Sequence, residues 1–211
     1  MIYGKEYFET YALLSLVYCY DPQLSALIAG DNEAPDWQSE ALDVGIEVTQ
    51  ALTPQEGENR FFLSEFFGED WDGDGQVHEH LRCTTGEALR DYEDSLMCIR
   101  AFYESRSSRE NVVDAVHEKL RKLNHHYKLF RRNWLYVFSD SALMNGDDLQ
   151  FIGEGYRALC QQMDLCFGKV FINVIDALVV LRPDGQWESY PVPKETQRKL
   201  HWESLERNSR G

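Results

Sequence analysis

Residues Asp31 to Leu52 read DNEAPDWQSEALDVGIEVTQAL, and the rest of the chain is interpreted around this stretch. It opens with turn-forming residues, and Pro35 fixes its own φ angle and favours an extended backbone before it. From Asp43 to Thr49 aliphatic and polar residues alternate, which is the period of a β-strand. The pattern predicts a strand with one aliphatic face and one polar face.

The polar face of this strand carries Asp43, Glu47 and Thr49, and Gly45 leaves room on it for another backbone or a ligand. In one interpretation this face is simply in contact with water. In the other, a turn after Trp37-Gln38 places Asp36 on the neighbouring strand, where it approaches Glu47. Two carboxylates held close together repel each other unless a cation lies between them, and Mg²⁺ prefers such oxygen ligands. The second interpretation therefore predicts a magnesium site.

Pro35-Asp36, with Glu47-Val48-Thr49 at the end of an apolar strand, resembles the core motif of the PD-(D/E)XK nuclease superfamily. The resemblance implies an α/β fold, namely a restriction-endonuclease-like three-layer sandwich with a central mixed sheet and a helical insertion. It also implies that Asp36 and Glu47 bind Mg²⁺ during hydrolysis of phosphodiester bonds in nucleic acid. Thr49 stands where the family usually has Lys and can only orient a water molecule, so we expect weak or lost activity.

Further site residues follow from the same resemblance. Residues 5–20 have apolar side chains on most sides, which predicts a buried helix. In the family, a Glu from the helix before the core hairpin often joins the metal site, and Glu9 matches it. Stabilisation of Glu9 by the helix dipole is the alternative. Asp43 is another candidate metal ligand, and Lys119 or Lys122 would supply the missing Lys from a nearby helix, as some members of the family do.

The segment from Arg106 to Asn133 is the basic part of an acidic protein. It has eight basic and three acidic residues, so it carries +5 while the remainder carries −20. Its apolar stripe from Val113 to Phe130 predicts a basic helix over about 106–133. One hypothesis is that this helix attracts the phosphates of nucleic acid despite the distant acids. The alternative is that it pairs with the acidic remainder of the molecule.

The remaining elements follow from periodicity and turn signals. The sequence predicts a buried strand at 133–139, a helix at about 147–163, and strands at 170–181 and 187–192 around the turn Arg182-Pro183-Asp184-Gly185. A polar C-terminal tail from about residue 194 is expected to form a short helix and then fray. The whole chain, 1–211, is expected to be a single nuclease-like domain with an insertion at about 53–106.

Composition limits the function further. A net charge of −15 argues against a general nucleic-acid coat protein. No apolar run is long enough to span a bilayer, and no signal peptide is evident, so no membrane association is expected. Five cysteines without a C-x-x-C pair favour a reducing, cytoplasmic location.

Two other classes of function stay open. An acidic protein with a nuclease-like fold could be a non-catalytic interaction module that binds a cationic protein, in the manner of an immunity protein. It could also be a subunit of a larger complex, with the aromatic residues between Phe61 and Trp71 as an interface. The sequence leaves the oligomeric state open.

Overall fold

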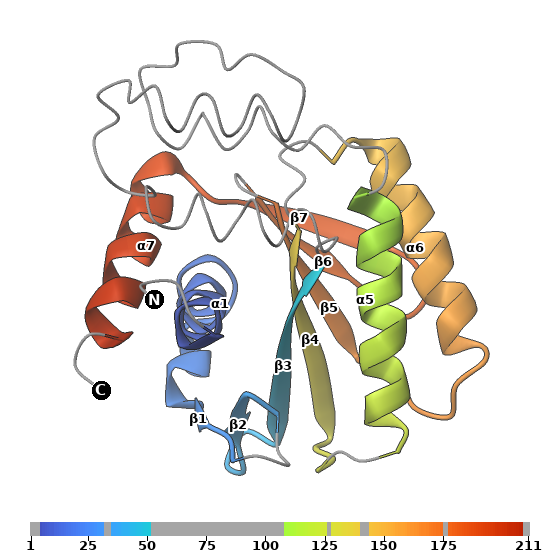
Figure 1. The fold of residues 1–211 in the computed structure, drawn as a ribbon, viewed down its shortest axis with the longest axis horizontal. Coiled ribbons are helices and arrows are strands. Elements are labelled where there is room, and N and C mark those ends of the chain that lie inside the picture. The colour runs from blue at the N-terminus through green and yellow to red at the C-terminus, as the bar shows by residue number, and fades with distance from the viewer. Residues whose placement is uncertain are drawn as a thin grey trace, which may run out of the picture.

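The structure, a computed structural model, is built on one mixed β-sheet (Figure 1). It describes residues 5–31, 35–51, 108–125, 128–139, 144–174 and 177–208. Seven strands lie in the order β1-β2-β3-β4-β5-β6-β7. The three central strands β3, β4 and β5 run parallel, and every other neighbouring pair is antiparallel. The predicted α/β class is confirmed for this part of the chain.

Two runs of three strands, β1–β3 and β5–β7, flank the single strand β4 in the order of the described elements, with helices between and outside them. In chain order they are α1 (Lys5–Cys19), the 3₁₀ helix η1 (Pro22–Ala26), β1 (Ile28–Ala29), β2 (Trp37–Ser39), β3 (Val44–Ala51), α5 (Ser108–Leu123), β4 (Arg132–Ser139), α6 (Gly146–Cys160), β5 (Lys169–Val174), β6 (Ala177–Leu181), β7 (Trp187–Pro191) and α7 (Lys194–Asn208). Among these helices, none combines the length and the apolar character needed to cross a lipid bilayer.

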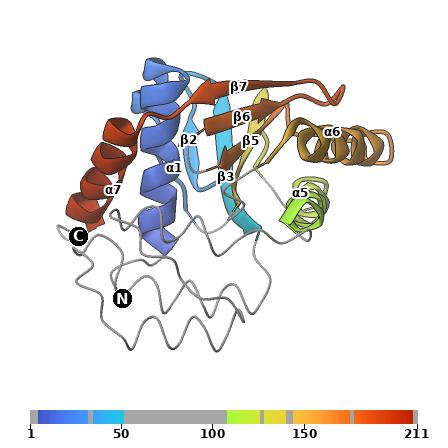
Figure 2. The same ribbon diagram turned by 90° about the horizontal axis from the view of Figure 1, so that it is seen from above.

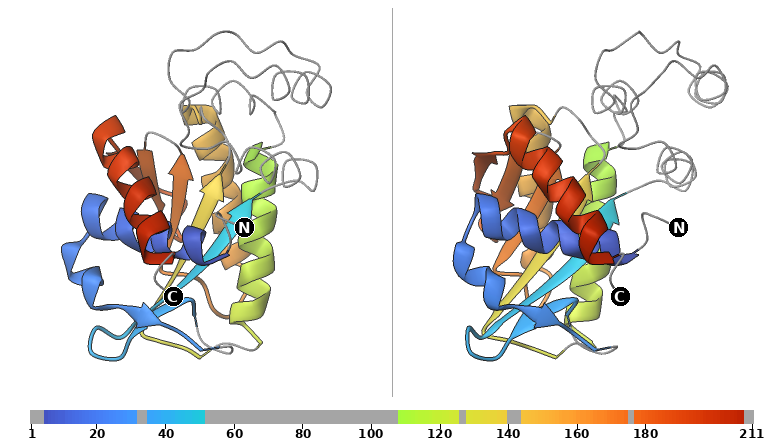
Figure 3. Two further views of the ribbon diagram at one scale, coloured as in Figure 1. Left: turned by 60° about the vertical axis from the view of Figure 1, so that its left-hand side comes forward. Right: turned by 90° about the vertical axis from the view of Figure 1, so that its left-hand side faces the viewer.

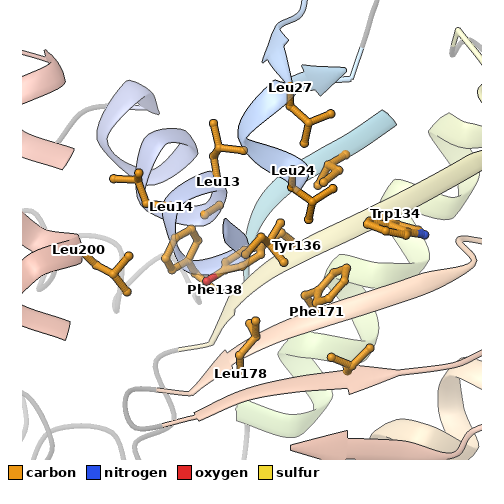
Figure 4. Close-up of a cluster of buried hydrophobic side chains, with 14 of the residues drawn as sticks. Leu13, Leu14, Leu24, Leu27, Trp134, Tyr136, Phe138, Phe171, Leu178 and Leu200 are labelled. Carbon is orange, nitrogen blue, oxygen red and sulfur yellow. The ribbon is translucent and has the colours of Figure 1, made fainter. Parts of the chain in front are cut away.

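Helices cover both faces of the sheet, with α1 and α7 on one side and α5 and α6 on the other (Figure 2). Successive strand residues point to opposite faces of the sheet, so each strand contributes to both of the cores that the helices cover. In β4, Trp134 and Tyr136 belong to the core under α1 and α7, whereas Leu135 and Val137 belong to the core under α5 and α6. Figure 4 shows the first of these cores, where residues of α1 and Leu200 of α7 surround the aromatic side chains of the central strands.

The predicted helix over 106–133 is too long. Helix α5 ends at Leu123, and β4 begins at Arg132. Asn124 ends the helix, because its side-chain amide donates to the carbonyls of Leu120 and Leu165, at 2.8 and 3.0 Å. Helix α5 contains only part of the predicted apolar stripe. Phe130, the last residue of the stripe, lies beyond the end of the helix.

Two other segments also differ from the prediction. The apolar run 170–181 forms two antiparallel strands, β5 and β6, instead of one. The polar segment after 194 forms the 15-residue helix α7, which packs on α1 (Figure 3). It does so because Leu200, His201 and Ser204 lie buried on one side of an otherwise polar helix. The predicted insertion at about 53–106, including the aromatic run 61–71, lies outside the described residues.

The space beside Gly45 is already filled. A Cβ atom at Gly45 would lie 2.6 Å from both the Phe130 ring and the Pro35 ring. Gly45 is therefore required because two rings pack directly against its backbone, and not because a ligand approaches it there. This contact fixes Pro35, and with it the start of β2, against β3.

Candidate functional site

Asp36 lies directly before β2, where that strand stops pairing with β3. The last paired residues are Trp37 and Ile46, so the N–H of Val48 lies beyond the reach of the β2 backbone. The Asp36 carboxylate replaces a backbone acceptor of β2, and its Oδ2 accepts a hydrogen bond from the Val48 N–H at 2.8 Å. A buried backbone donor needs a partner, and this requirement fixes the Asp36 side chain at the edge of β3.

Helix α1 brings Glu9 and Lys5 to the same place. The Lys5 ammonium lies 3.0 Å from Oε1 of Glu9 and 3.2 Å from Oδ1 of Asp36. The indole N–H of Trp37 donates to the main-chain carbonyl of Glu9 at 2.8 Å, which ties α1 to the start of β2. Two acidic side chains from different elements therefore meet at one cation.

Glu9 has the most perturbed acidic group of the site. Burial of its carboxyl, reinforced by a hydrogen bond with Asp36 and opposed by Lys5, raises the pKa of Glu9 to about 7. Burial disfavours the charged form, and a neighbouring carboxylate disfavours it further. At neutral pH a large fraction of Glu9 therefore holds a proton.

Glu47 faces the other side of the sheet, towards α5. Its neighbour on β4 is Leu135, which belongs to the core under α5 and α6. The Lys119 ammonium lies 2.5 Å from Glu47 Oε1, and the two side chains are only 16% and 8% exposed. A pair this deeply buried is stable only while both partners are present, because either charge alone would be left without compensation.

The structure separates the two candidate lysines. Lys119 reaches the strand, but Lys122 is half-exposed and lies 3.7 Å from Glu118 on its own helix. Thr49 follows Glu47 by two residues and so shares its face of β3, where it is half-buried. Of the residues named for the missing strand Lys, only Lys119 brings a positive charge to Glu47.

Asp43 is not brought to the other candidate ligands. It lies just before β3, about 13 Å from Glu47 along the strand at roughly 3.3 Å per residue. Its Oδ1 accepts from the Arg131 N–H at 2.8 Å, and its backbone has a positive φ of 50°. Asp43 therefore closes the turn between β2 and β3 and holds the start of β4.

Two ion-paired groups thus flank a single peptide bond, the one that joins Glu47 to Val48. Asp36, Glu9 and Lys5 form the first group, and Glu47 and Lys119 form the second. Within the described ranges, no cluster of three or more His, Cys, Asp or Glu side chains is arranged to hold a metal ion. The set of four predicted ligands is therefore not assembled in this arrangement.

The donor set at Asp36 and Glu9 nevertheless fits a cation. Asp36 uses one oxygen on the Val48 N–H and turns the other, with Glu9, towards a single positive charge. Sequence reasoning found both acids but missed Lys5, which occupies this position. The available signal was the i,i+4 spacing of Lys5 and Glu9 on one helix face.

Comparison of the chain with known protein families, with curated proteins and with solved structures gave no match. The function is therefore argued from the geometry of the site.

Proposed function

We propose that this protein is a divergent member of the PD-(D/E)XK superfamily that hydrolyses phosphodiester bonds of nucleic acid slowly, with Mg²⁺. The contact between Lys119 and Glu47 carries the proposal. The family usually has a Lys, and so a positive charge, beside the Glu that corresponds to Glu47. Thr49, which stands in that place here, carries no charge. Lys119 supplies that charge from α5, as expected for a lysine that has moved to a helix.

The arrangement of the elements supports the same proposal. A restriction-endonuclease-like sandwich has a mixed central sheet with helices on both faces and its acidic residues on neighbouring strands. Here β3 carries Glu47, Asp36 leads into the neighbouring β2, and α1 and α5 lie on opposite faces beside them. Helix α1 also contributes Glu9, in the position that the resemblance gives it.

Each residue has a defined part in this chemistry. Asp36 and Glu9 would hold the ion on the α1 side of β3, whereas Glu47, which faces α5, would hold Lys119 beside the site. Mg²⁺ lowers the pKa of a bound water and stabilises charge on a phosphoryl oxygen. Lys119 would stabilise the negative charge that develops on the attacked phosphate, which requires its release from Glu47. Thr49, on the same face of β3, would orient the attacking water.

The resting arrangement explains why we expect a slow reaction. Lys5 neutralises Asp36 and Glu9, and Lys119 neutralises Glu47. An ion that binds here must compete with two ammonium groups, and Glu9 must lose its proton. The acidic remainder of the chain also disfavours the approach of a polyanion.

The test is a cleavage assay on single- and double-stranded DNA and RNA with Mg²⁺ or Mn²⁺. We expect slow, metal-dependent cleavage that falls about 100-fold or more in Lys119→Met and in Glu47→Gln, because each variant removes a charge from the site. Lys199→Met is the matched control, since this exposed lysine lies on α7, across the sheet from α5, in an i,i+4 pair with Glu203. Circular dichroism melting would verify that each variant is folded.

Two results would contradict the nuclease proposal. One is the absence of cleavage by the wild-type protein with either metal. The other is an equal loss of activity in Lys199→Met and Lys119→Met, which would place the chemistry elsewhere.

The second candidate is a non-catalytic acidic module that binds a cationic protein. The net charge of −15 and the pairing of Glu9, Asp36 and Glu47 with lysines favour it. This candidate predicts no cleavage under any of these conditions, together with salt-sensitive binding of a basic partner.

A further inference from the structure

Glu9 and Asp36, the two acidic residues on the α1 side of β3, share Lys5 as their cationic partner. The side chains of Glu9 and Asp36 are 19% and 10% exposed, whereas the side chain of Lys5 is 81% exposed. Two largely buried carboxyl groups therefore share one ammonium at the end of a flexible, solvent-exposed side chain.

The anions are fixed by the fold, and the cation is not. The Val48 N–H holds Asp36, while the Trp37 indole holds the α1 backbone at Glu9. Lys5 is the first residue of α1, and its ammonium contacts the same two carboxyl groups. The ammonium can leave without any rearrangement of the sheet, and the two carboxylates would then face each other without a counter-ion.

We propose that Lys5 is a built-in competitor for the divalent cation at Glu9 and Asp36. Its ammonium occupies the position between the two carboxylates, and the ion binds there when the Lys5 side chain swings out into solvent. This inference rests on the proposed function, because it concerns the regulation of that site. It makes the metal affinity of the resting protein low and gives the protein a residue that sets this affinity.

The test measures the binding of Mn²⁺ alone by isothermal titration calorimetry at fixed pH and ionic strength. Lys5→Met keeps the aliphatic stem and removes the charge, and we expect it to bind Mn²⁺ about tenfold more tightly than the wild type, about 1.4 kcal/mol. Lys5→Arg retains the charge that competes with the ion at Glu9 and Asp36, so its Kd for Mn²⁺ should lie within about twofold of the wild-type value. Combining Lys5→Met with Asp36→Asn should abolish the gain.

Lys199→Met is the matched control, because Lys199 is another exposed lysine in an i,i+4 pair with a Glu, at 3.8 Å from Glu203. It should leave the affinity for Mn²⁺ unchanged. Thermal melting would establish that each variant retains its fold, which is expected for a side chain as exposed as Lys5.

The outcomes separate this inference from the nuclease proposal. Affinity in Lys5→Met that equals or falls below that of the wild type, or an equal gain in Lys199→Met, would overturn the role of Lys5. Tighter Mn²⁺ binding without any cleavage of nucleic acid would support the inference and count against the nuclease. Metal-dependent cleavage by the wild type, with unchanged affinity in Lys5→Met, would do the reverse.

Discussion

At the scale of single residues, Gly45 shows how closely the hairpin of β2 and β3 is packed. An added methyl group would lie 2.6 Å from both Phe130 and Pro35, so both rings would have to shift. We expect Gly45→Ala to lower the free energy of unfolding by about 1–3 kcal/mol, the usual effect of overpacking. The measurement is urea denaturation at pH 7.

Gly146 is the matched control for this substitution, because no atom lies within 4 Å of the Cβ that alanine would add there. Gly146→Ala should change the free energy of unfolding by less than about 1 kcal/mol, and a stabilisation would be consistent with its place in α6. Equal destabilisation by the two variants would contradict the packing argument.

Sequence reasoning reached individual site residues unevenly. The motif indicates Asp36 and Glu47, and the resemblance leaves Lys119 and Lys122 as alternatives, between which the contact of Lys119 with Glu47 distinguishes. Lys5 was missed because nothing in a linear motif indicates which cation neutralises a pair of acids. Whether Asp36 and Glu47 act together on a metal ion stays a prediction.

At the scale of elements, hydrophobic periodicity predicts β4 as a buried strand. It does not predict where α5 ends or how long the polar helix α7 is. β4 was predicted because its residues are apolar on both faces. The end of α5 depends on Asn124, whose partner Leu165 lies far along the chain. α7 is polar almost all round and becomes a stable helix through burial of Leu200, His201 and Ser204. Such tertiary contacts override local pattern.

The contact between α7 and α1 should make stability depend on pH. His201 lies buried, with its Nδ1 2.9 Å from the Tyr7 hydroxyl, and burial lowers the pKa of His201 to about 4. Between about pH 6.5 and pH 4 the unfolded chain takes up a proton at His201 that the folded chain does not. The contribution of this histidine is therefore complete above pH 6.5 and is lost as the pH falls towards 4.

We expect His201→Gln to lose less stability than the wild type between pH 7 and pH 4, by roughly 2 kcal/mol. The measurement is the urea midpoint at a series of pH values, because carboxylates add their own acid dependence and only the difference between proteins isolates the histidine. His117→Gln, on the exposed side of α5, should follow the wild type. A wild-type profile for His201→Gln would show that this group does not govern the acid response.

At the scale of the whole molecule, the basic charge is divided differently from the prediction. α5 has four basic residues (Arg109, Lys119, Arg121, Lys122) and three acidic ones (Glu110, Asp114, Glu118), so its net charge is only +1. Lys128 and Arg131, between α5 and β4, and Arg132, the first residue of β4, supply three further charges. The end of α5 and the start of β4 lie at the same end of the molecule (Figure 1).

This basic end is where we expect nucleic acid to approach. Arg121 and Lys122 are exposed there, whereas Lys119 is occupied by Glu47. Replacing both exposed residues by Glu should weaken binding of DNA or RNA and lower the slope of log K against log salt by about 1.4–1.8, the effect of losing two phosphate contacts. Lys119→Met should instead reduce cleavage and change this slope less.

Fluorescence anisotropy of a labelled oligonucleotide, at several salt concentrations with Ca²⁺ in place of Mg²⁺, would measure both effects. Lys199→Glu is the control, because α7 covers the opposite face of the sheet from α5 (Figure 2). A general effect of added negative charge would weaken binding equally in this control, whereas a local phosphate contact would not. Unchanged affinity and an unchanged salt slope in the Arg121→Glu, Lys122→Glu protein would place any nucleic-acid surface elsewhere. That result would favour the second candidate, an acidic module that binds a cationic protein.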